Sequence, residues 1–212
     1  MPVIDPNALK PLDRYRLMIG SVVPRPIAWV STVNSAGVVN LAPFSFFTGV
    51  GSKPCSLMIS IGYRDPAKDT LRNLRNQGEA VVQLPPQHLL DQMHQTGGEY
   101  KSDLSELDLL EIAHEPAEVV APPRVAGCDI AMECRFMQEV LVGDPDTPAT
   151  AVFLEVLRVH VSDQVAAADG LPDPHKLMTV GRLGDRAYLA GEGWQVQDRD
   201  KQRVPDEHRR QR

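Results

Sequence analysis

Short runs of alternating apolar and polar residues follow one another along this chain, and turn-forming residues separate them. Such runs predict β-strands. We expect strands over residues 27–33, 38–42, 44–50, 55–61, 79–84, 130–142 (broken near its end) and 151–161, and a last short strand over 186–189. The turn from Asn34 to Gly37 predicts a hairpin, and the turn from Gly143 to Pro148 joins the two longest strands.

Helical spacing is rarer than strand alternation. Residues 71–76 carry it, follow Lys68-Asp69-Thr70 and end before Gly78, so a helix is expected there. We expect Asp69 or Thr70 to cap this helix, because capping is the commonest role of Asp and Thr at a helix start. A short helix is expected over 88–95 and another within 99–112, and residues 172–178 form a weak helix or a loop.

Together these elements predict a mainly β, α+β domain over residues 1–194, followed by a polar, mobile tail over residues 195–212. Strands and helices do not alternate regularly, and no G-x-G-x-x-G motif follows a strand, which argues against a Rossmann fold. A net charge of −6 argues against a general nucleic-acid binder. No apolar run approaches the roughly 18 residues of a membrane span, and the N-terminus lacks signal-peptide features, so we expect a cytoplasmic protein.

The three cysteines, Cys55, Cys128 and Cys134, are too few and too widely spaced for a disulfide framework or a zinc site. We therefore expect no metal centre. Cys128 and Cys134 flank and enter an apolar segment, which favours buried structural thiols.

Lys68-Asp69-Thr70 is a candidate anion site. A cation and a hydroxyl at a helix start lie beside free backbone N–H groups and the positive end of the helix dipole. A phosphate-bearing ligand is therefore the first hypothesis. The alternative is that Asp69 or Thr70 only caps the helix and that Lys68 is a solvated surface charge.

Four segments occur in an order that resembles the flavin reductase-like family, the FMN-binding split-barrel proteins that include flavoredoxin. They are residues 21–32 (SVVPRPIAWVST), 40–47 (NLAPFSFF), 60–64 (SIGYR) and 68–70 (KDT). The resemblance is strong over about residues 12–84, continues through the strands that end near Val161, and is closest to the flavoredoxin-like subgroup. It implies an open six-stranded Greek-key barrel with a few peripheral helices, usually a homodimer, with FMN or FAD near the subunit interface.

The resemblance also implies a cofactor site. Lys68 and Thr70 would bind the flavin phosphate, Asp69 would cap the helix, and residues 40–47 would line the isoalloxazine and ribityl groups. The full predicted set is Arg25, Asn40, Ala42, Pro43, Ser45, Phe46, Phe47, Ser60, Ile61, Gly62, Arg64, Lys68 and Thr70. No side chain is expected to act as a catalytic acid or base, because the flavin supplies the chemistry.

Several of these residues have structural alternatives. Trp29 could be core or a cofactor wall, and at least one of the three phenylalanines of segment 44–47 should be core. Arg64 could pair with Asp65 or lie in solvent. Arg182 and Tyr188 resemble a C-terminal Arg…Gly…Tyr segment of the family and are weaker candidates.

The leading hypothesis is an oxidoreductase whose bound flavin passes electrons from NADH or NADPH to an acceptor. Many relatives carry a His after Gly-Asp in the loop before the late strand, where this chain has Gly143-Asp144-Pro145, and His160 and His175 are not obvious replacements. This departure motivates the alternative of a flavoredoxin-type electron-transfer protein that is reduced by a redox protein partner. A third hypothesis is a flavin-binding module without activity. The sequence does not distinguish NADH from NADPH.

Overall fold

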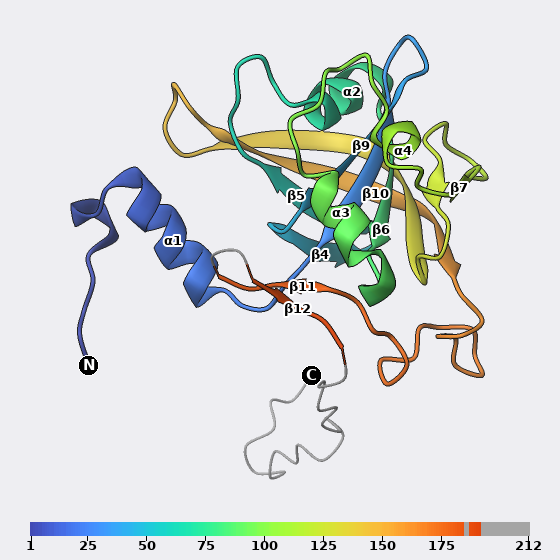
Figure 1. The fold of residues 1–212 in the computed structure, drawn as a ribbon. Coiled ribbons are helices and arrows are strands. Elements are labelled where there is room, and N and C mark those ends of the chain that lie inside the picture. The colour runs from blue at the N-terminus through green and yellow to red at the C-terminus, as the bar shows by residue number, and fades with distance from the viewer. Residues whose placement is uncertain (185–186, 192–212) are drawn as a thin grey trace.

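The computed structural model describes residues 1–184 and 187–191, so the predicted tail and Arg186 lie outside the described residues (Figure 1). Its helices are η1 (Pro6–Ala8), α1 (Pro11–Ser21), α2 (Asp69–Gln77), η2 (Gln87–Leu89), α3 (Leu90–Gln95) and α4 (Glu106–Leu109). Its strands are β1 (Arg25–Pro26), β2 (Ala28–Val33), β3 (Val39–Phe44), β4 (Phe47–Ser52), β5 (Cys55–Ile61), β6 (Glu79–Leu84), β7 (His114–Glu115), β8 (Arg124–Val125), β9 (Ile130–Val142), β10 (Ala149–Val161), β11 (Gly181–Arg182) and β12 (Tyr188–Leu189). None of the described helices is long and apolar enough to cross a membrane.

One large antiparallel sheet dominates the molecule, as predicted. Its seven strands lie in the order β3-β2-β6-β9-β10-β5-β4. The outer strands, β3 and β4, are consecutive in the chain and are joined only by Ser45 and Phe46, so the sheet must curl until its two edges approach each other. The bend at these two residues divides one expected extended run into two strands.

The two faces of the sheet bury two separate apolar clusters. Inside the curl lie side chains from alternate strand positions, including Val30, Ile59 and Leu154. On the other face, Trp29 and Leu41 pack beneath the short helices with Met93 of α3. Strand β2 supplies both clusters because its neighbouring side chains point to opposite faces, and five of its six residues are buried.

Helix α2 covers one end of the sheet and contacts β2, β3 and β6. It ends at Gly78, whose φ of 75° is the left-handed conformation that favours glycine, and the Gly78 N–H donates to Leu74 O at 2.9 Å. The prediction that Asp69 or Thr70 caps this helix is wrong. The cap position is occupied by Lys68, and no side chain caps the helix, because Asp69 and Thr70 already lie inside the first turn.

Segment 99–112 holds one short helix, α4, as predicted. Residues 172–178 form a loop, one of the two expected alternatives. Helix α1 was not predicted. It projects from one side of the molecule near β11 and β12, which form a small second sheet with β1 (Figure 1).

Candidate cofactor site

Two adjoining pockets lie along the bend from β3 towards β4. The first, of about 120 Å³, opens at the N-terminus of α2. We call it the helix-end pocket, and it is lined by Asn40, Ala42, Pro43, Phe44, Arg64, Lys68, Asp69, Thr70, Thr96, Gly97, Gly98, Glu99, Tyr100 and Glu106. The second, of about 340 Å³, is called the Tyr188 pocket, and it is lined by Tyr15, Ile27, Pro43, Ser45, Met93, His94, Gly97, Arg182 and Tyr188. Pro43 and Gly97 belong to both linings, so the two pockets are neighbours.

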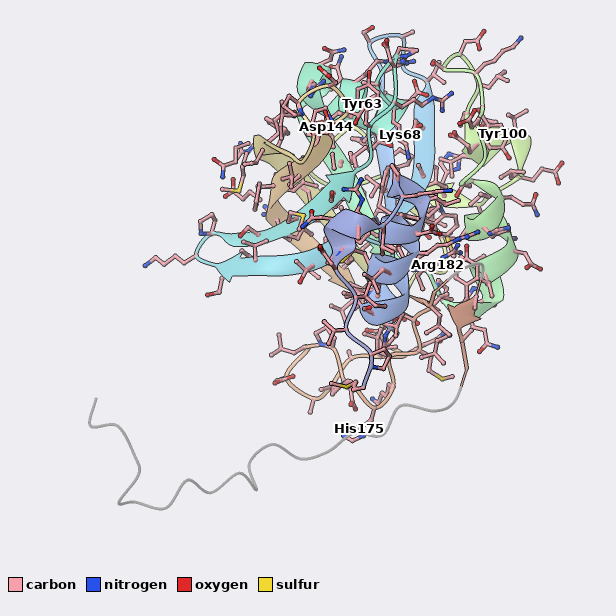
Figure 2. The ribbon with its side chains drawn as sticks, turned by 90° about the vertical axis from the view of Figure 1, so that its left-hand side faces the viewer. Tyr63, Lys68, Tyr100, Asp144, His175 and Arg182 are labelled. Carbon is pink, nitrogen blue, oxygen red and sulfur yellow. The ribbon has the colours of Figure 1, made fainter. Side chains whose placement is uncertain are left out.

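Figure 2 looks at the side of the molecule from which α1 projects, and it shows Lys68 above Arg182, one residue from each pocket. The wall between the pockets is narrow. A Cβ atom at Gly97 would lie 3.4 Å from Cγ of Pro43 and 3.2 Å from the backbone oxygen of His94. Glycine therefore allows the turn after α3 to approach the bend of β3 closely.

The hydroxyl of Thr70 is held at the floor of the helix-end pocket. Thr70 is 1% exposed, and its Oγ1 accepts a hydrogen bond of 2.9 Å from Nδ2 of Asn40. The same Asn40 amide lies 3.3 Å from Oγ1 of Thr32, which also accepts from Asn73 at 3.0 Å. Because Thr70 accepts in this network, its own O–H remains a donor towards the pocket.

Positive charge gathers above this floor. Nζ of Lys68 lies 5.9 Å from the ring centroid of Phe44, which packs in the buried cluster inside the curl. The pKa of the Lys68 amino group is lowered, first by desolvation and then by the neighbouring Arg64 guanidinium, while Glu99 opposes the shift. Arg64 pairs with Glu99 at 3.3 Å, and its predicted pairing with Asp65 is not the one found. An anion bound here would relieve the repulsion between Lys68 and Arg64.

The first turn of α2 offers backbone donors to the same pocket. Its first N–H groups have no partner within the helix, and no side chain caps them. The Asp69 carboxylate, which could have capped them, instead pairs with Arg72. The donor set of this pocket therefore fits a phosphate group: an ammonium, a hydroxyl and a helix N-terminus.

Glu106 places one carboxylate beside these cations. It is 6% exposed, and its Oε2 accepts the backbone N–H of Leu41 at 2.8 Å. Burial raises the pKa of the Glu106 carboxyl, the Leu41 N–H opposes this shift, and nearby Asp69 reinforces it. Its contact with β3 indicates a structural role in shaping the pocket wall.

A buried hydrogen-bond chain fixes α3 against the sheet. Nε1 of Trp29 donates to Oγ1 of Thr96 at 2.9 Å, and this hydroxyl donates to the backbone oxygen of Met93 at 2.8 Å. Trp29 is 0% exposed and lies in the cluster beneath the short helices. Of its two interpretations, core residue and cofactor wall, the structure therefore favours the core residue. Through its hydrogen bond to Thr96, Trp29 nevertheless positions Gly97, the next residue, which lines both pockets.

The Tyr188 pocket combines apolar walls with polar aromatic groups. Ile27, Pro43 and Met93 supply apolar surface. Nδ1 of His94 lies 2.9 Å from the hydroxyl of Tyr188, and the two rings meet edge to face. The guanidinium carbon of Arg182 lies 4.4 Å from the Tyr188 ring centroid, a cation–π distance. Such a pocket can hold a flat, partly polar ring.

Arg25 lies behind this pocket and ties three segments together. Its Nη1 donates to the backbone oxygens of Ile19 and Val22, at 2.6 and 2.8 Å, and its Nη2 donates to Leu183 O at 3.1 Å. Its Nε lies 3.4 Å from Oγ of Ser45. Burial lowers the pKa of the Arg25 guanidinium. The structure thus gives Arg25 a role in holding the end of α1 and the segment after β11, and its contact with a cofactor stays a prediction.

The structure brings together just over half of the predicted site residues. The helix-end pocket contains Asn40, Ala42, Pro43, Arg64, Lys68 and Thr70, and the Tyr188 pocket contains Pro43 and Ser45. Neither lining includes Arg25, Phe46, Phe47, Ser60, Ile61 or Gly62. Phe46 is 37% exposed, and its backbone oxygen accepts the Ser60 N–H at 2.8 Å. These neighbours of the bend support the site, and their contact with a cofactor stays a prediction.

A larger pocket of about 1,060 Å³ lies where β9 starts and β10 ends, and its lining includes none of the predicted cofactor residues. In it, His160 Nε2 lies 2.6 Å from Oε1 of the fully buried Glu133. Burial favours a raised pKa for Glu133, but the Glu118 N–H, His160 and the Val119 N–H together lower it. The described residues contain no group of His, Cys, Asp or Glu that could hold a metal ion.

The cysteines take no part in either cofactor pocket. All three are free thiols, with Cys134 buried, Cys128 half-buried and Cys55 exposed. Burial raises the pKa of both the Cys128 and the Cys134 thiols to about 12. Both are therefore protonated at neutral pH, as structural thiols are.

Comparison with known proteins identifies the family. The family model for the flavin reductase like domain matches residues 19–178. The structure is similar to nitrilotriacetate monooxygenase component B from Bacillus cereus, at 30% identity and a TM-score of 0.86, over 92% of this chain and 98% of that one. It is also similar to the 2-nitrobenzoate 2-nitroreductase NbaA of Pseudomonas fluorescens, at 25% identity and a TM-score of 0.84, over 97% of each chain.

A flavoredoxin of Desulfovibrio vulgaris shares the fold at 21% identity and a TM-score of 0.73, over 85% of this chain and 93% of that one. The curled antiparallel sheet is thus the split barrel of FMN-binding proteins. Because the matched residues 19–178 span more than half of the sequence, the chain belongs to the flavin reductase-like family.

Proposed function

We propose that this protein is an FMN-binding oxidoreductase that moves electrons from NADH or NADPH, through the bound flavin, to an acceptor. The observation that carries the proposal is the pair of adjoining pockets. One has the donors that a phosphate needs, and the other has the apolar and aromatic walls that a flat ring needs.

At the phosphate end, Lys68, the Thr70 hydroxyl and the first N–H groups of α2 would bind the phosphate. Arg64 would add charge from the pocket rim. A single phosphate matches this small pocket, which supports FMN over FAD. Asn40 would act indirectly, since its amide fixes the acceptor side of Thr70.

At the ring end, Pro43 and Ser45 would lie along the ring, with Tyr188 and Met93 on the opposite wall. When bound, the flavin would supply the hydride and electron chemistry. The protein would orient it, exclude water from one side and place positive charge near it. The names of two similar solved structures, a monooxygenase component and a nitroreductase, support the oxidoreductase class.

We further propose that the protein is a cytoplasmic homodimer. Helix α1 stands out from the sheet with only Ile19 buried, while Leu12, Tyr15 and Met18 are exposed (Figure 1). An apolar helix face of this kind is typical of an interface. A second copy that covers α1 would also enclose the Tyr188 pocket, because Tyr15 of α1 is part of its lining.

Anaerobic titration of the purified protein with added FMN tests the oxidoreductase. We expect bound FMN to bleach on addition of NADH or NADPH and to regain its colour in air. Turnover of both nicotinamides no faster than with free FMN would contradict NAD(P)H dependence.

The second candidate is a flavoredoxin-type electron-transfer protein, favoured by the Gly143-Asp144-Pro145 loop, which offers no histidine. It predicts slow reduction by nicotinamides and rapid reduction by a ferredoxin-like donor. Rapid turnover of NADH or NADPH would exclude it.

A further inference from the structure

We propose that His94, held by Tyr188, supplies the proton that accompanies electrons into the Tyr188 pocket. The inference rests on the proposed flavin function and deepens it, since it assigns a proton donor to a reaction for which the sequence predicts none. The residues that carry it come from three distant parts of the chain: His94 from α3, Arg182 from β11 and Tyr188 from β12.

His94 is held through both its helix and its ring. Helix α3 is anchored by the buried chain from Trp29 through Thr96 to the backbone oxygen of Met93, the residue next to His94. Tyr188 then fixes the imidazole itself through the 2.9 Å contact at Nδ1. A group anchored at both its backbone and its ring has the fixed orientation that proton transfer requires.

Tyr188 can serve both protonation states of His94. Its hydroxyl accepts from the Nδ1–H of an imidazolium and donates to the Nδ1 of a neutral imidazole. The ring therefore keeps one hydrogen bond when it gains or loses a proton. Because Tyr188 holds Nδ1, Nε2 is the nitrogen that exchanges the proton. Histidine is also the side chain that ordinarily changes charge between pH 5 and 8.

Positively charged side chains lie around the pocket that His94 lines. Arg182 lies over the Tyr188 ring, and its charge is close enough to Arg25 to contribute to the lowered pKa of that guanidinium. Among the described lining residues of the pocket there is no carboxylate, and Tyr15 of α1 is the other titratable neighbour. On α3 itself, Asp91 precedes His94 by one turn and is exposed. A bound ring that gains negative charge would therefore be attracted towards Arg182 and Arg25.

The proton balance is simple. A hydride from NAD(P)H brings two electrons and one proton, which leaves the reduced ring one proton short of neutral. The Nε2–H bond of the His94 imidazolium would break to supply that proton, which leaves the imidazole neutral and still bonded to Tyr188, and the nicotinamide would leave oxidised. Solvent would return a proton to Nε2 before the next turnover.

The test compares His94→Gln and Tyr188→Phe with the wild-type protein. His88→Gln is the matched control, because His88 is also exposed and lies one helix earlier, but lines the larger pocket. FMN affinity is measured first by fluorescence titration. NMR titration of the imidazoles is then performed with FMN oxidised and with FMN reduced by dithionite, which makes the readout independent of NADH.

Because the reduced ring would exchange its proton with His94, the two groups titrate as a coupled pair. We therefore expect reduction to change the proton affinity of His94 at least tenfold, with a smaller change in Tyr188→Phe and none at His88. With NADH as the donor, His94→Gln should reduce bound FMN about a hundredfold more slowly, the lower end of what a general acid contributes. His94 proton affinity that is unchanged on reduction, or a wild-type reduction rate in His94→Gln, overturns the inference alone. Failure of the wild-type protein to bind FMN overturns the proposed function and the inference together.

Discussion

The two pockets of the candidate site are built in different ways. The helix-end pocket draws its cations and hydroxyl from one loop and helix start, Arg64 to Thr70, placed over the strand that contains Asn40. The Tyr188 pocket draws one or two residues each from α1, the β1–β2 junction, the bend after β3, α3, β11 and β12, which span most of the chain. Anion binding here is thus a local property of the sequence, whereas ring binding depends on the completed fold. Variants that affect one pocket and spare the other test this difference.

Lys68→Ala should give the largest difference between its effects on FMN binding and on riboflavin binding. A charge-assisted hydrogen bond contributes about 1.5–3 kcal/mol, so the dissociation constant of FMN should rise about 10- to 100-fold. Riboflavin lacks the phosphate, and its affinity should not change. Fluorescence titration with both flavins measures the contrast. The fold should survive because Lys68 is exposed.

Lys53→Ala, in the exposed turn between β4 and β5, is the control for loss of a lysine charge. Unchanged FMN affinity in Lys68→Ala would show that the phosphate assignment is wrong. An equal loss for riboflavin would place Lys68 at the ring instead.

Thr96→Val should not separate the two flavins, because Thr96 lines the helix-end pocket and also anchors α3, which lines the Tyr188 pocket. It keeps the shape of the side chain but leaves the buried Trp29 N–H without an acceptor, at a cost of about 1–3 kcal/mol of unfolding free energy. Because α3 would loosen, FMN and riboflavin should both bind more weakly, and by the same factor. Urea unfolding and the two titrations measure this, with Thr48→Val on exposed β4 as the control. Weakening confined to FMN would contradict the proposed separation.

The smallest effect should come from Glu106→Gln at the helix-end pocket. Burial raises the pKa of Glu106 in the folded state, so the folded protein binds this proton more tightly than the unfolded chain does. The stability that this tighter proton binding adds is fully present below the ordinary glutamate pKa of about 4.3. It is lost as the pH rises from there through the raised pKa of the folded state.

The glutamine keeps an acceptor for the Leu41 N–H and removes the titration, so stability should vary less with pH across this window. Urea unfolding at several pH values measures the change, and Asp108→Asn, exposed on the same helix, is the control. A pH profile identical to that of the wild type would rule out this role for Glu106.

The difference between local and non-local features also explains which parts of the structure could be predicted from the sequence. Strands β5, β6 and β9 have the predicted bounds, and α2 and its Gly78 end are confirmed, because their alternation and turn signals are local. Lys68 and Thr70 lie together in one pocket for the same reason. The tie between Asn40 and Thr70 needed the fold, since it joins residues 30 positions apart.

What the sequence could not predict is non-local or short. Strands β1 and β11 have two residues each, too few for any periodicity. Helix α1 buries only Ile19, and most of its other large apolar residues are exposed, so packing on its own domain does not account for it. His94 lies among polar residues of a short helix, and its partner is 94 positions away. The Gly97-Gly98 pair after α3 was the one available signal that the backbone makes a close approach there.

The three backbone oxygens held by Arg25 have a consequence for the order of synthesis. Ile19 and Val22 precede Arg25 and leave the ribosome with it, whereas Leu183 is made 158 residues later. Arg182 and Tyr188 are on the same late segment. A nascent chain that has reached Glu106 already contains every lining residue of the helix-end pocket, but the Tyr188 pocket cannot close until almost the whole chain exists. Any arrest or truncation before β11 would therefore give a chain that has all the residues of the phosphate end and lacks the opposite wall of the ring end.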